Sequence, residues 1–322
     1  MVPLQTASGP WFERRGILLR VSDGEGREGW GEIAPVPEFG SESWTQAMVY
    51  LKESDQEALE HPEAVPAYLT ATRFAIETAL SSLDAPPAEF GFENTVLLPG
   101  GEASLEALHE RREQGFRCYK LKLGVLEPAA ELALVQALWD VLPEEAELRL
   151  DANGSFTARQ LRWWLEHLEG MDRIGFIEQP LPPGHESTMQ RILDEGGIPL
   201  ALDESLAGVD GLQQAFEEWR WTGPMILKLS ILGALDPLRR RVQGAHERLI
   251  ASSVFETAIG LYQSLRIAHE LGVERAVGYG TLAFFDDGWN GFKLEPQLTS
   301  TMVCPEIFRE IWNQACHRWS KV

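Results

Sequence analysis

The sequence predicts an α/β fold in which a (β/α)8 TIM barrel follows a smaller N-terminal α+β domain, which is called the capping domain below. Eight short apolar runs recur at intervals of about 25 residues from residue 94 onward, and amphipathic helical segments separate most of them. The alternative, a doubly wound open sheet, is disfavoured because no GxGxxG motif follows the first apolar run. A chain of 322 residues is long enough for such a barrel and a smaller appended domain.

Residues 1–92 are expected to form the capping domain. The elements expected in it are a hairpin, a loop and two helices, at residues 12–36, 34–43, 44–60 and 66–83. The hairpin is predicted because two apolar-alternating runs flank the turn-forming stretch SDGEG. Pro66 is expected at the start of the second helix, where its missing N–H costs little. The stretch DAPPAEFGF then breaks the helical pattern and suggests the domain boundary.

Residues 93–290 are expected to form the barrel. The eight predicted strands lie within residues 94–100, 118–124, 147–153, 174–180, 199–205, 225–230, 248–256 and 275–280. The last segment, 291–322, contains an amphipathic stretch at 305–319 and is expected to pack back on the capping domain.

Composition limits the classes of partner. A formal charge of −21 argues against nucleic acid and anionic membranes, and no apolar run is long enough to span a bilayer. Three cysteines without CxxC or Cys/His spacing argue against a disulfide framework or a zinc site. The sequence therefore predicts a cytoplasmic protein, and its net charge does not prevent an anionic small molecule from binding a locally cationic pocket.

Lysines occupy unusual places in the sequence. Lys120 and Lys122 lie two residues apart in the apolar run CYKLKLG, so they share one face of the predicted strand. A surface strand with one polar face is the simplest interpretation. However, the chain has only six lysines, and a third, Lys228, lies in another apolar run, MILKLS. This distribution favours a functional role.

Acidic residues stand at the carboxyl ends of the three predicted strands between these lysines: Asp151 in LDAN, Glu178 in IEQP and Asp203 in LDES. Because catalytic groups of a barrel gather at this end of the strands, we expect the three carboxylates to converge. Clustered carboxylates repel, and a dication relieves the repulsion. Oxygen ligands suit Mg²⁺ or Mn²⁺. Each motif alone fits a strand end or a helix N-cap, but the register shared by five strands favours a metal site.

Lys122 and Lys228 are expected to face each other across this site. A nearby cation and partial burial both lower the pKa of a lysine, so that a neutral amine near pH 7 becomes possible. The lysines are therefore predicted to transfer protons.

The motifs KLK, DAN, EQP and DES, followed by a lysine on the sixth predicted strand, resemble those of the enolase superfamily, muconate-lactonizing subgroup. The resemblance covers nearly the whole chain and implies a modified (β/α)8 TIM barrel with an N-terminal α+β capping domain. It implies an enzyme that binds Mg²⁺ through Asp151, Glu178 and Asp203 and acts on a small-molecule carboxylate with a lysine base.

The resemblance also implies roles for single residues. Lys122 would take the proton α to the substrate carboxylate and return it to a departing hydroxyl, while Lys228 would stay cationic and stabilise the enediolate. Lys120 would lower the pKa of Lys122 by like-charge repulsion. Asn153 and Glu204 would lie beside the metal.

Three stretches, GWGEIAPVPEFGSES, RFAIETAL and SSVFETAIG, are similar to the o-succinylbenzoate synthase family within this subgroup. This similarity implies dehydration of 2-succinyl-6-hydroxy-2,4-cyclohexadiene-1-carboxylate to o-succinylbenzoate, on the way to menaquinone or phylloquinone. Ser252 or Ser253 would then contact the succinyl tail. The seventh predicted strand carries no histidine, so a His–Asp base of the mandelate-racemase type is not expected.

Two alternatives keep the same residues. The lysines and metal also suit an N-acylamino acid racemase, a dipeptide epimerase or a cycloisomerase, and a non-enzymatic barrel could use the metal to bind an anion as a scaffold. Outside the site, Arg14 and Arg15 are expected to be solvated, and Gly31 and Glu32 to serve the hairpin.

Overall fold

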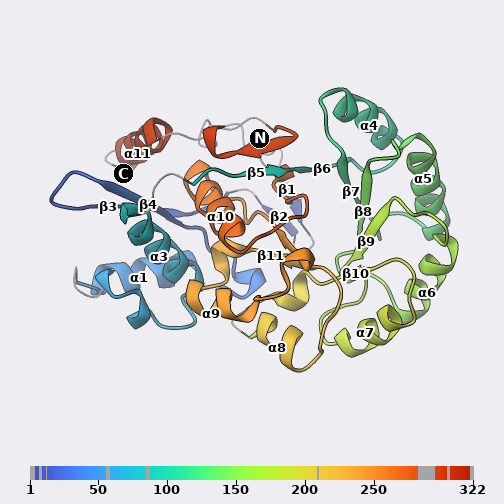
Figure 1. Ribbon diagram of the computed structural model, residues 1–322, viewed down its shortest axis with the longest axis horizontal. Helices are drawn as coiled ribbons and strands as arrows, with labels where there is room; N and C mark the ends of the chain where they lie inside the picture. Colours follow the sequence, from blue (N-terminus) through green and yellow to red (C-terminus); the bar gives the residue numbers. More distant parts are fainter. Residues whose placement is uncertain are drawn as a thin grey trace.

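The computed structural model describes residues 4–6, 9–11, 13–55, 59–84, 88–208, 210–281, 294–302 and 305–319. A curved array of strands with helices on its outer side fills one part of the molecule, and the N-terminal elements lie beside it together with the last helix (Figure 1). Among the described residues, no helix is both long and apolar enough to cross a membrane.

Parallel strands form the barrel. The strands are β6 (Thr95–Leu97), β7 (Cys118–Lys122), β8 (Glu147–Asp151), β9 (Ile174–Glu178), β10 (Leu200–Ala201), β11 (Met225–Leu227) and β12 (Leu249–Ala251). The first five form one sheet in the order β10-β9-β8-β7-β6, and β11 pairs with β12. Single parallel bridges complete the ring, joining Leu202 to Met225, Ser252 to Gly278 and Val277 to Asn94. The predicted barrel is confirmed, with its eighth strand reduced to bridges at residues 277 and 278.

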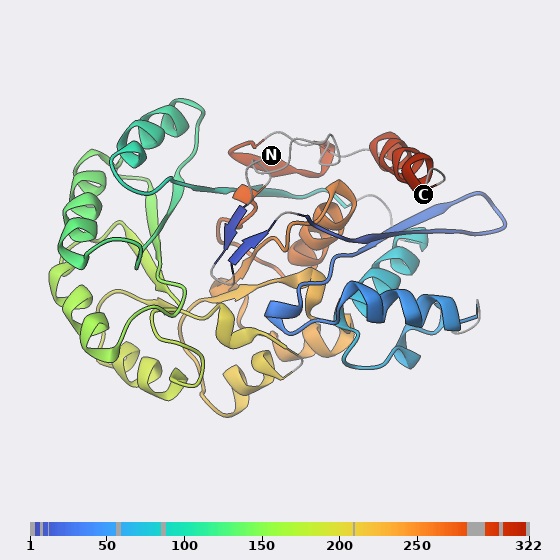
Figure 2. The same ribbon diagram turned by 180° about the vertical axis from the view of Figure 1, so that it is seen from behind.

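Helices surround this ring (Figure 2). They are α4 (Ala103–Glu113), α5 (Pro128–Val141), α6 (Ala158–His167), α7 (Glu186–Asp194), α8 (Gly211–Glu217), α9 (Leu235–Arg241) and α10 (Ala258–Glu270), with 3-10 turns η3 (Glu204–Leu206), η4 (Leu229–Ile231) and η5 (His246–Arg248). They bury the outward faces of the strands; Trp164 of α6 is fully buried.

The inside of the barrel holds an apolar layer below a charged one. Phe176, Ala201, Ile226 and Ile250 form one buried cluster, and the Arg149 guanidinium lies 5.0 Å from the centre of the Phe176 ring. Side chains two residues apart on a strand share a face. The residues two positions after these five are Asp151, Glu178, Asp203, Lys228 and Ser252. Strand geometry therefore places the charged residues above the apolar layer, toward the carboxyl ends of the strands.

The capping domain contains the predicted hairpin, formed by β3 (Ile17–Ser22) and β4 (Glu28–Ile33). Its other elements are β1 (Leu4–Thr6), β2 (Gly9–Trp11), η1 (Pro37–Phe39), α1 (Trp44–Glu53), η2 (Pro62–Ala64) and α3 (Thr70–Asp84). The hairpin strand β4 packs directly on α3. An added Cβ at Gly29 or Gly31 would lie 2.0 or 2.2 Å from a carbonyl oxygen of α3, so only glycine fits.

Both predicted helices of this domain are shorter than expected. The first ends at Glu53, where Ser54 is extended and its hydroxyl bonds to the Tyr50 carbonyl at 2.8 Å. The second begins at Thr70 rather than at Pro66. The carboxylate of Glu42 accepts the N–H groups of Ala71 (3.0 Å) and Thr72 (2.7 Å) and therefore caps the helix there.

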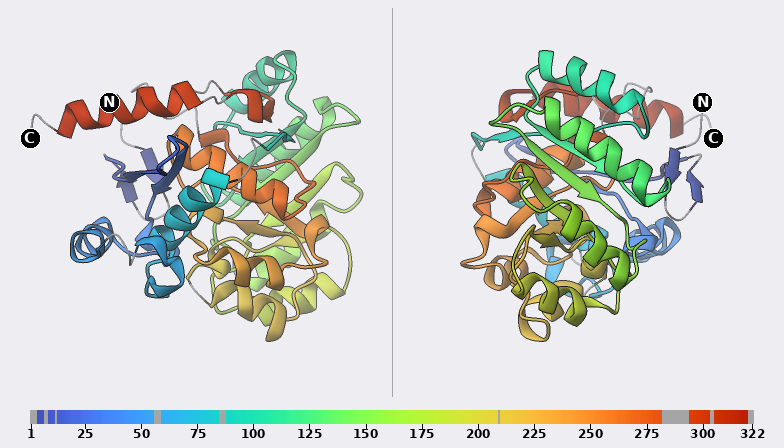
Figure 3. Two further views of the ribbon diagram at one scale, coloured as in Figure 1. Left: turned by 60° about the vertical axis from the view of Figure 1, so that its left-hand side comes forward. Right: turned by 90° about the vertical axis from the view of Figure 1, so that its right-hand side faces the viewer.

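The C-terminal elements β13 (Gln297–Thr299), η7 (Ser300–Met302) and α11 (Pro305–Trp319) return to the start of the chain. Strand β13 pairs with β5 (Gly91–Glu93), and α11 lies along the β3–β4 hairpin (Figure 3). Arg309 of α11 bonds to Glu28 at 2.7 Å, and the Phe308 and Trp30 rings lie 6.0 Å apart. The domain boundaries after residues 92 and 290 stay a prediction, and the second lies outside the described residues.

Candidate active site

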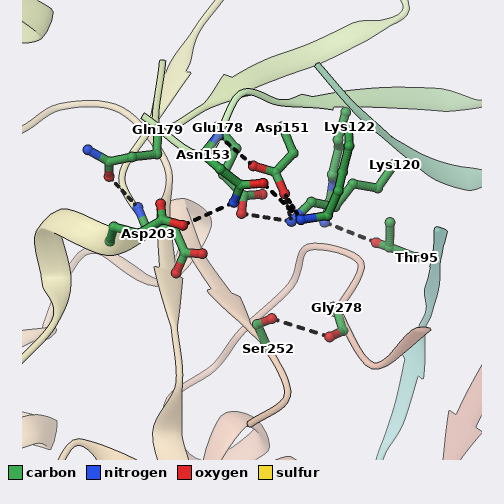
Figure 4. A network of polar contacts seen from close by, with 12 residues as sticks. Thr95, Lys120, Lys122, Asp151, Asn153, Glu178, Gln179, Asp203, Ser252 and Gly278 are labelled. Carbon is green, nitrogen blue, oxygen red and sulfur yellow. Dashed lines mark hydrogen bonds and ion pairs between the residues drawn. The ribbon is translucent and has the colours of Figure 1, made fainter. Parts of the chain in front are cut away.

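Strand register brings the charged residues together. Lys122, Asp151 and Glu178 are paired neighbours on β7, β8 and β9, while Asp203 and Lys228 follow the ends of β10 and β11. Figure 4 shows the lysines of β7 pointing toward the carboxylates of the next strands. This juxtaposition joins residues that lie more than a hundred positions apart in the chain.

Lys120 lies between two carboxylates. Its ammonium is 2.7 Å from Glu178 Oε1 and 3.0 Å from Asp151 Oδ2, and both carboxylate side chains are 2% exposed. Two short ion pairs to buried anions fix this lysine in place.

Lys122 is the more accessible lysine of β7, with 43% of its side chain exposed. Its ammonium donates to Asn153 Oδ1 at 2.8 Å and lies 4.0 Å from Asp151 Oδ2. Asn153 also donates from Nδ2 to Glu204 Oε1 at 3.0 Å and has a φ of 45°. The predicted neighbours Asn153 and Glu204 therefore link Lys122 to the loop that carries Asp203.

Lys228 lies on the opposite side of the ring, because β11 is four strands from β7 in a barrel of eight. Only 11% of its side chain is exposed. Its ammonium forms a short ion pair with Asp203 and lies 4.0 Å from the centre of the Phe39 ring. Phe39 belongs to η1 of the capping domain, so the two lysines have different surroundings.

Gln179 is a site residue that the sequence analysis missed. It is fully buried with a φ of 37°, and its Oε1 accepts the N–H groups of Asp203 (2.9 Å) and Ser205 (3.1 Å). Its Nε2 donates to Ser205 Oγ at 2.7 Å. The middle residue of EQP thus holds the Asp203 loop; the signal for it in the sequence was an amide directly after Glu178, at the end of an apolar run.

Electrostatics show an excess of buried negative charge. Burial and the adjacent Asp151 raise the pKa of Glu178 to about 8, although Lys120 opposes this shift. Burial likewise raises the pKa of Glu204, with Asp203 adding to the effect. Burial alone would lower the pKa of Lys120, but Asp151 and Glu178 outweigh it and hold the pKa above its usual value. Lys120 therefore stays cationic between the two carboxylates.

The chemistry of this residue set fits a hard divalent cation. Among the described residues, no group of three acidic, cysteine or histidine side chains is arranged so that it could hold a metal ion. Instead, Lys120 and Lys228 pair with Asp151, Glu178 and Asp203 and supply the positive charge. The donors are nevertheless buried oxygens with a raised pKa among them, which is the condition that Mg²⁺ relieves.

The two candidate serines point to different places. Ser252 continues the inward face of β12 after Ile250, and its hydroxyl donates to the carbonyl oxygen of Gly278 on the neighbouring strand at 3.3 Å (Figure 4). The Ser253 hydroxyl instead donates to Glu256 Oε2 at 2.7 Å and accepts from the N–H of Phe255 at 2.8 Å. Ser252 is therefore the serine that faces the site.

Arg14 is not solvated as expected. It donates to the carbonyl oxygens of Val254 (3.2 Å) and Pro35 (2.9 Å), and burial lowers its pKa. The Glu32 side chain does not stabilise its own hairpin as expected. Glu32 is 3% exposed, and its carboxylate accepts the N–H groups of Thr257 and Gly260 at the start of α10. Arg15 does stay exposed and pairs with Glu13.

Comparison with known proteins assigns the family. A family model described as "Enolase C-terminal domain-like" matches residues 103–285, and one described as "MenC, N-terminal domain" matches residues 8–83. An o-succinylbenzoate synthase of Thermosynechococcus vestitus is 33% identical over 305 residues, covering 92% of each chain. The chain belongs to the o-succinylbenzoate synthase family.

A second relative and a crystal structure agree with this assignment. An o-succinylbenzoate synthase of Salmonella arizonae is 32% identical over 84% of this chain and 83% of its own. The crystal structure of the o-succinylbenzoate synthase of Thermosynechococcus elongatus BP-1, complexed with Mg in the active site, superposes with a TM-score of 0.83 and 30% identity, covering 97% of this chain and 95% of that one. The family resemblance expected from the KLK, DAN, EQP and DES motifs is confirmed.

Proposed function

We propose that the protein is a Mg²⁺-dependent o-succinylbenzoate synthase, a hydro-lyase of menaquinone or phylloquinone biosynthesis. It would dehydrate 2-succinyl-6-hydroxy-2,4-cyclohexadiene-1-carboxylate to o-succinylbenzoate. The observation that carries the proposal is the pair of lysines on opposite sides of a barrel mouth that also holds three buried carboxylates. We also propose that the protein is cytoplasmic.

Lys122 is the proposed base. Its accessible amine would take the proton from the carbon α to the substrate carboxylate, and the resulting enediolate would expel the β-hydroxyl. The same proton, now on Lys122 Nζ, would join the departing hydroxyl to form water, so that acid and base act on one face of the ring. Lys120 stays charged between Asp151 and Glu178, so it would hold these two carboxylates in place beside the base.

Lys228 is the proposed electrostatic partner. Its position four strands from Lys122 would put its ammonium beside the negative charge that develops on the substrate. Asp151, Glu178 and Asp203 would hold Mg²⁺, or Mn²⁺ in its place. When bound, the dication would supply Lewis-acid stabilisation of the substrate carboxylate. Ser252 would lie where it can donate to the succinyl group.

The unequal surroundings of the lysines support a one-base reaction. Racemization needs a proton donor and an acceptor that exchange roles on the two faces of a carbon, whereas dehydration on one face needs only one mobile base. Lys122 is 43% exposed, but Lys228 is 11% exposed and lies between Asp203 and Phe39. This difference favours dehydration over the racemase and epimerase alternatives.

An ultraviolet assay tests the proposal. The purified protein with Mg²⁺ is mixed with the cyclohexadiene substrate and, separately, with a panel of N-succinylamino acids and dipeptides. We expect the aromatic product to appear only with the first. No aromatic product, together with racemization in the panel, would assign the site to the racemase class. No reaction with either, while an anionic ligand still binds, would favour the scaffold.

A further inference from the structure

Glu32 joins the capping domain to the barrel. Its carboxylate accepts the Thr257 N–H at 2.9 Å, the Thr257 hydroxyl at 2.6 Å and the Gly260 N–H at 3.0 Å. These donors lie at the first turn of α10, where helix N–H groups lack partners and a negative charge is favoured. A Cβ on Gly260 would lie 2.7 Å from both Glu32 Oε2 and Glu256 Cβ, so this approach requires a glycine. A strand of one domain thus caps a helix of the other.

The segment before this helix, the β12–α10 turn (residues 252–257), has two more contacts with the capping domain. Arg14 donates from Nε and Nη2 to the Val254 carbonyl oxygen, at 3.3 and 3.2 Å. The ring of Trp11 lies 5.4 Å from that of Phe255. Phe255 has a φ of 63°, a left-handed conformation that is costly for a bulky residue and persists only when its surroundings impose it. Three side chains of the capping domain therefore hold one turn.

The β12–α10 turn is also connected to the catalytic side of the barrel. It begins with Ser252, which faces the site, and Glu256 within it accepts from the Ser230 hydroxyl at 3.2 Å. Ser230 lies in η4, two residues after Lys228. The buried Glu256 carboxylate also accepts the Val254 N–H at 2.7 Å, which keeps the turn compact. A shift of the turn would therefore move Ser252 and the chain that follows Lys228.

We propose that Glu32, Arg14 and Trp11 are positioning residues that act from the capping domain. They fix the β12–α10 turn and thereby set the place of Ser252 and of the η4 segment at the barrel mouth. None of the three needs to touch substrate. The inference rests on the proposed function, because it assigns these residues to the geometry of that site.

Two measurements test this inference. The first compares kcat and KM of the wild type with those of Glu32→Ala, Glu32→Gln, Arg14→Met and the control Gln263→Met, well below the unfolding temperature. The second follows backbone hydrogen–deuterium exchange in the same proteins without substrate. Gln263 is the matched control because it also joins α10 to β4: its side chain donates to the Trp30 carbonyl oxygen at 2.6 Å and accepts from Arg266 at 2.9 Å, and neither partner belongs to the turn.

We expect Glu32→Ala and Arg14→Met to raise KM about tenfold and to speed amide exchange across residues 252–257 by a similar factor. Glu32→Gln, whose amide oxygen still accepts an N–H, should fall between these variants and the wild type. Gln263→Met should lower the melting temperature but leave KM and the exchange of the turn within about twofold of wild type. Stability loss alone would not raise KM at a temperature where all variants are folded.

The inference is overturned if Glu32→Ala and Arg14→Met keep the wild-type KM, or if Gln263→Met raises KM equally. If Glu32→Ala does not fold, the same two measurements on Arg14→Met, which removes the contact with Val254, decide the question. If the wild type does not dehydrate the substrate, the proposed function fails. The exchange data then still decide whether the capping domain holds the turn.

Discussion

The two halves of the barrel rim reach similar chemistry by different construction. Strands β7, β8 and β9 have five residues each and belong to one sheet, and Lys122 at their edge is 43% exposed. Strands β10, β11 and β12 have only two or three residues, single bridges complete their ring, and Lys228 is 11% exposed beneath Phe39. We call the part of the rim on β7, β8 and β9 the open half and the part on β10, β11 and β12 the covered half. Strand register alone positions the charged residues of the open half, whereas those of the covered half also depend on contacts with the capping domain. Substitutions in the two halves should therefore differ in their effect on stability.

The largest effect is expected for Lys122→Met in the open half. Removing the base should lower kcat by about 10³-fold, while the exposed side chain leaves little structural cost. Mg²⁺ affinity, measured by calorimetry, and the melting temperature should stay near wild type, as in the control Lys52→Met on the surface of α1. Retention of more than a tenth of kcat would remove Lys122 from the role of base.

Lys228→Met tests the covered half. We expect kcat to fall about 10²-fold because one charge that stabilises the transition state is lost. Unlike Lys122→Met, this change should also lower the melting temperature of the metal-free protein, since it leaves the Asp203 carboxylate buried without its cation. Thermal unfolding with and without Mg²⁺ measures this difference. Equal melting temperatures for the two lysine variants would contradict the proposed contrast between the halves.

The buried carboxylates predict a pH dependence for the metal-free protein. The pKa of Glu178 is raised to about 8 by burial and by Asp151, so the folded state binds a proton that the unfolded chain releases near its ordinary pKa. Folding stability should then decline as pH rises toward 8, and chelator-treated protein should melt at lower temperature at pH 8 than at pH 6. Saturating Mg²⁺ should reduce this decline. If the difference in melting temperature between the Mg²⁺-saturated and the chelator-treated protein does not change with pH, Mg²⁺ and the Glu178 proton do not share one site.

The smallest effect is expected for Phe39→Leu. Loss of the ring over the Lys228 ammonium should lower kcat/KM by about threefold to tenfold, in line with one partly buried cation–π contact. Phe39→Tyr keeps the aromatic face and should retain most of the activity. Steady-state kinetics of the two variants side by side separate the aromatic contribution from simple loss of volume.

The open half was largely predictable from the sequence. Lys120, Lys122, Asp151 and Glu178 lie on long apolar runs whose alternation specifies both the strand and the inward face. The barrel itself followed from the same repeating pattern. The alternation of apolar residues along one strand is enough to predict its inward-facing residues where the strand pairs with its neighbours over most of its length.

The covered half was less predictable because its contacts join distant parts of the chain. Glu32 was expected to serve its own hairpin and Arg14 to be solvated, yet both contact residues more than 200 positions away. Glu42 starts a helix at Thr70 that was expected to begin at Pro66. A single sequence does not show which buried carboxylate caps which helix, since the capping residue lies outside the helix's own pattern.

A crystal structure of the protein with Mg²⁺ and o-succinylbenzoate is the most direct test of the central claim, that both halves of the rim converge on one metal and one substrate. We expect Asp151, Glu178 and Asp203 to bind a single ion, and Lys122 and Lys228 to lie on opposite faces of the product. An ion bound away from these carboxylates, or both lysines on the same face of the product, would contradict it.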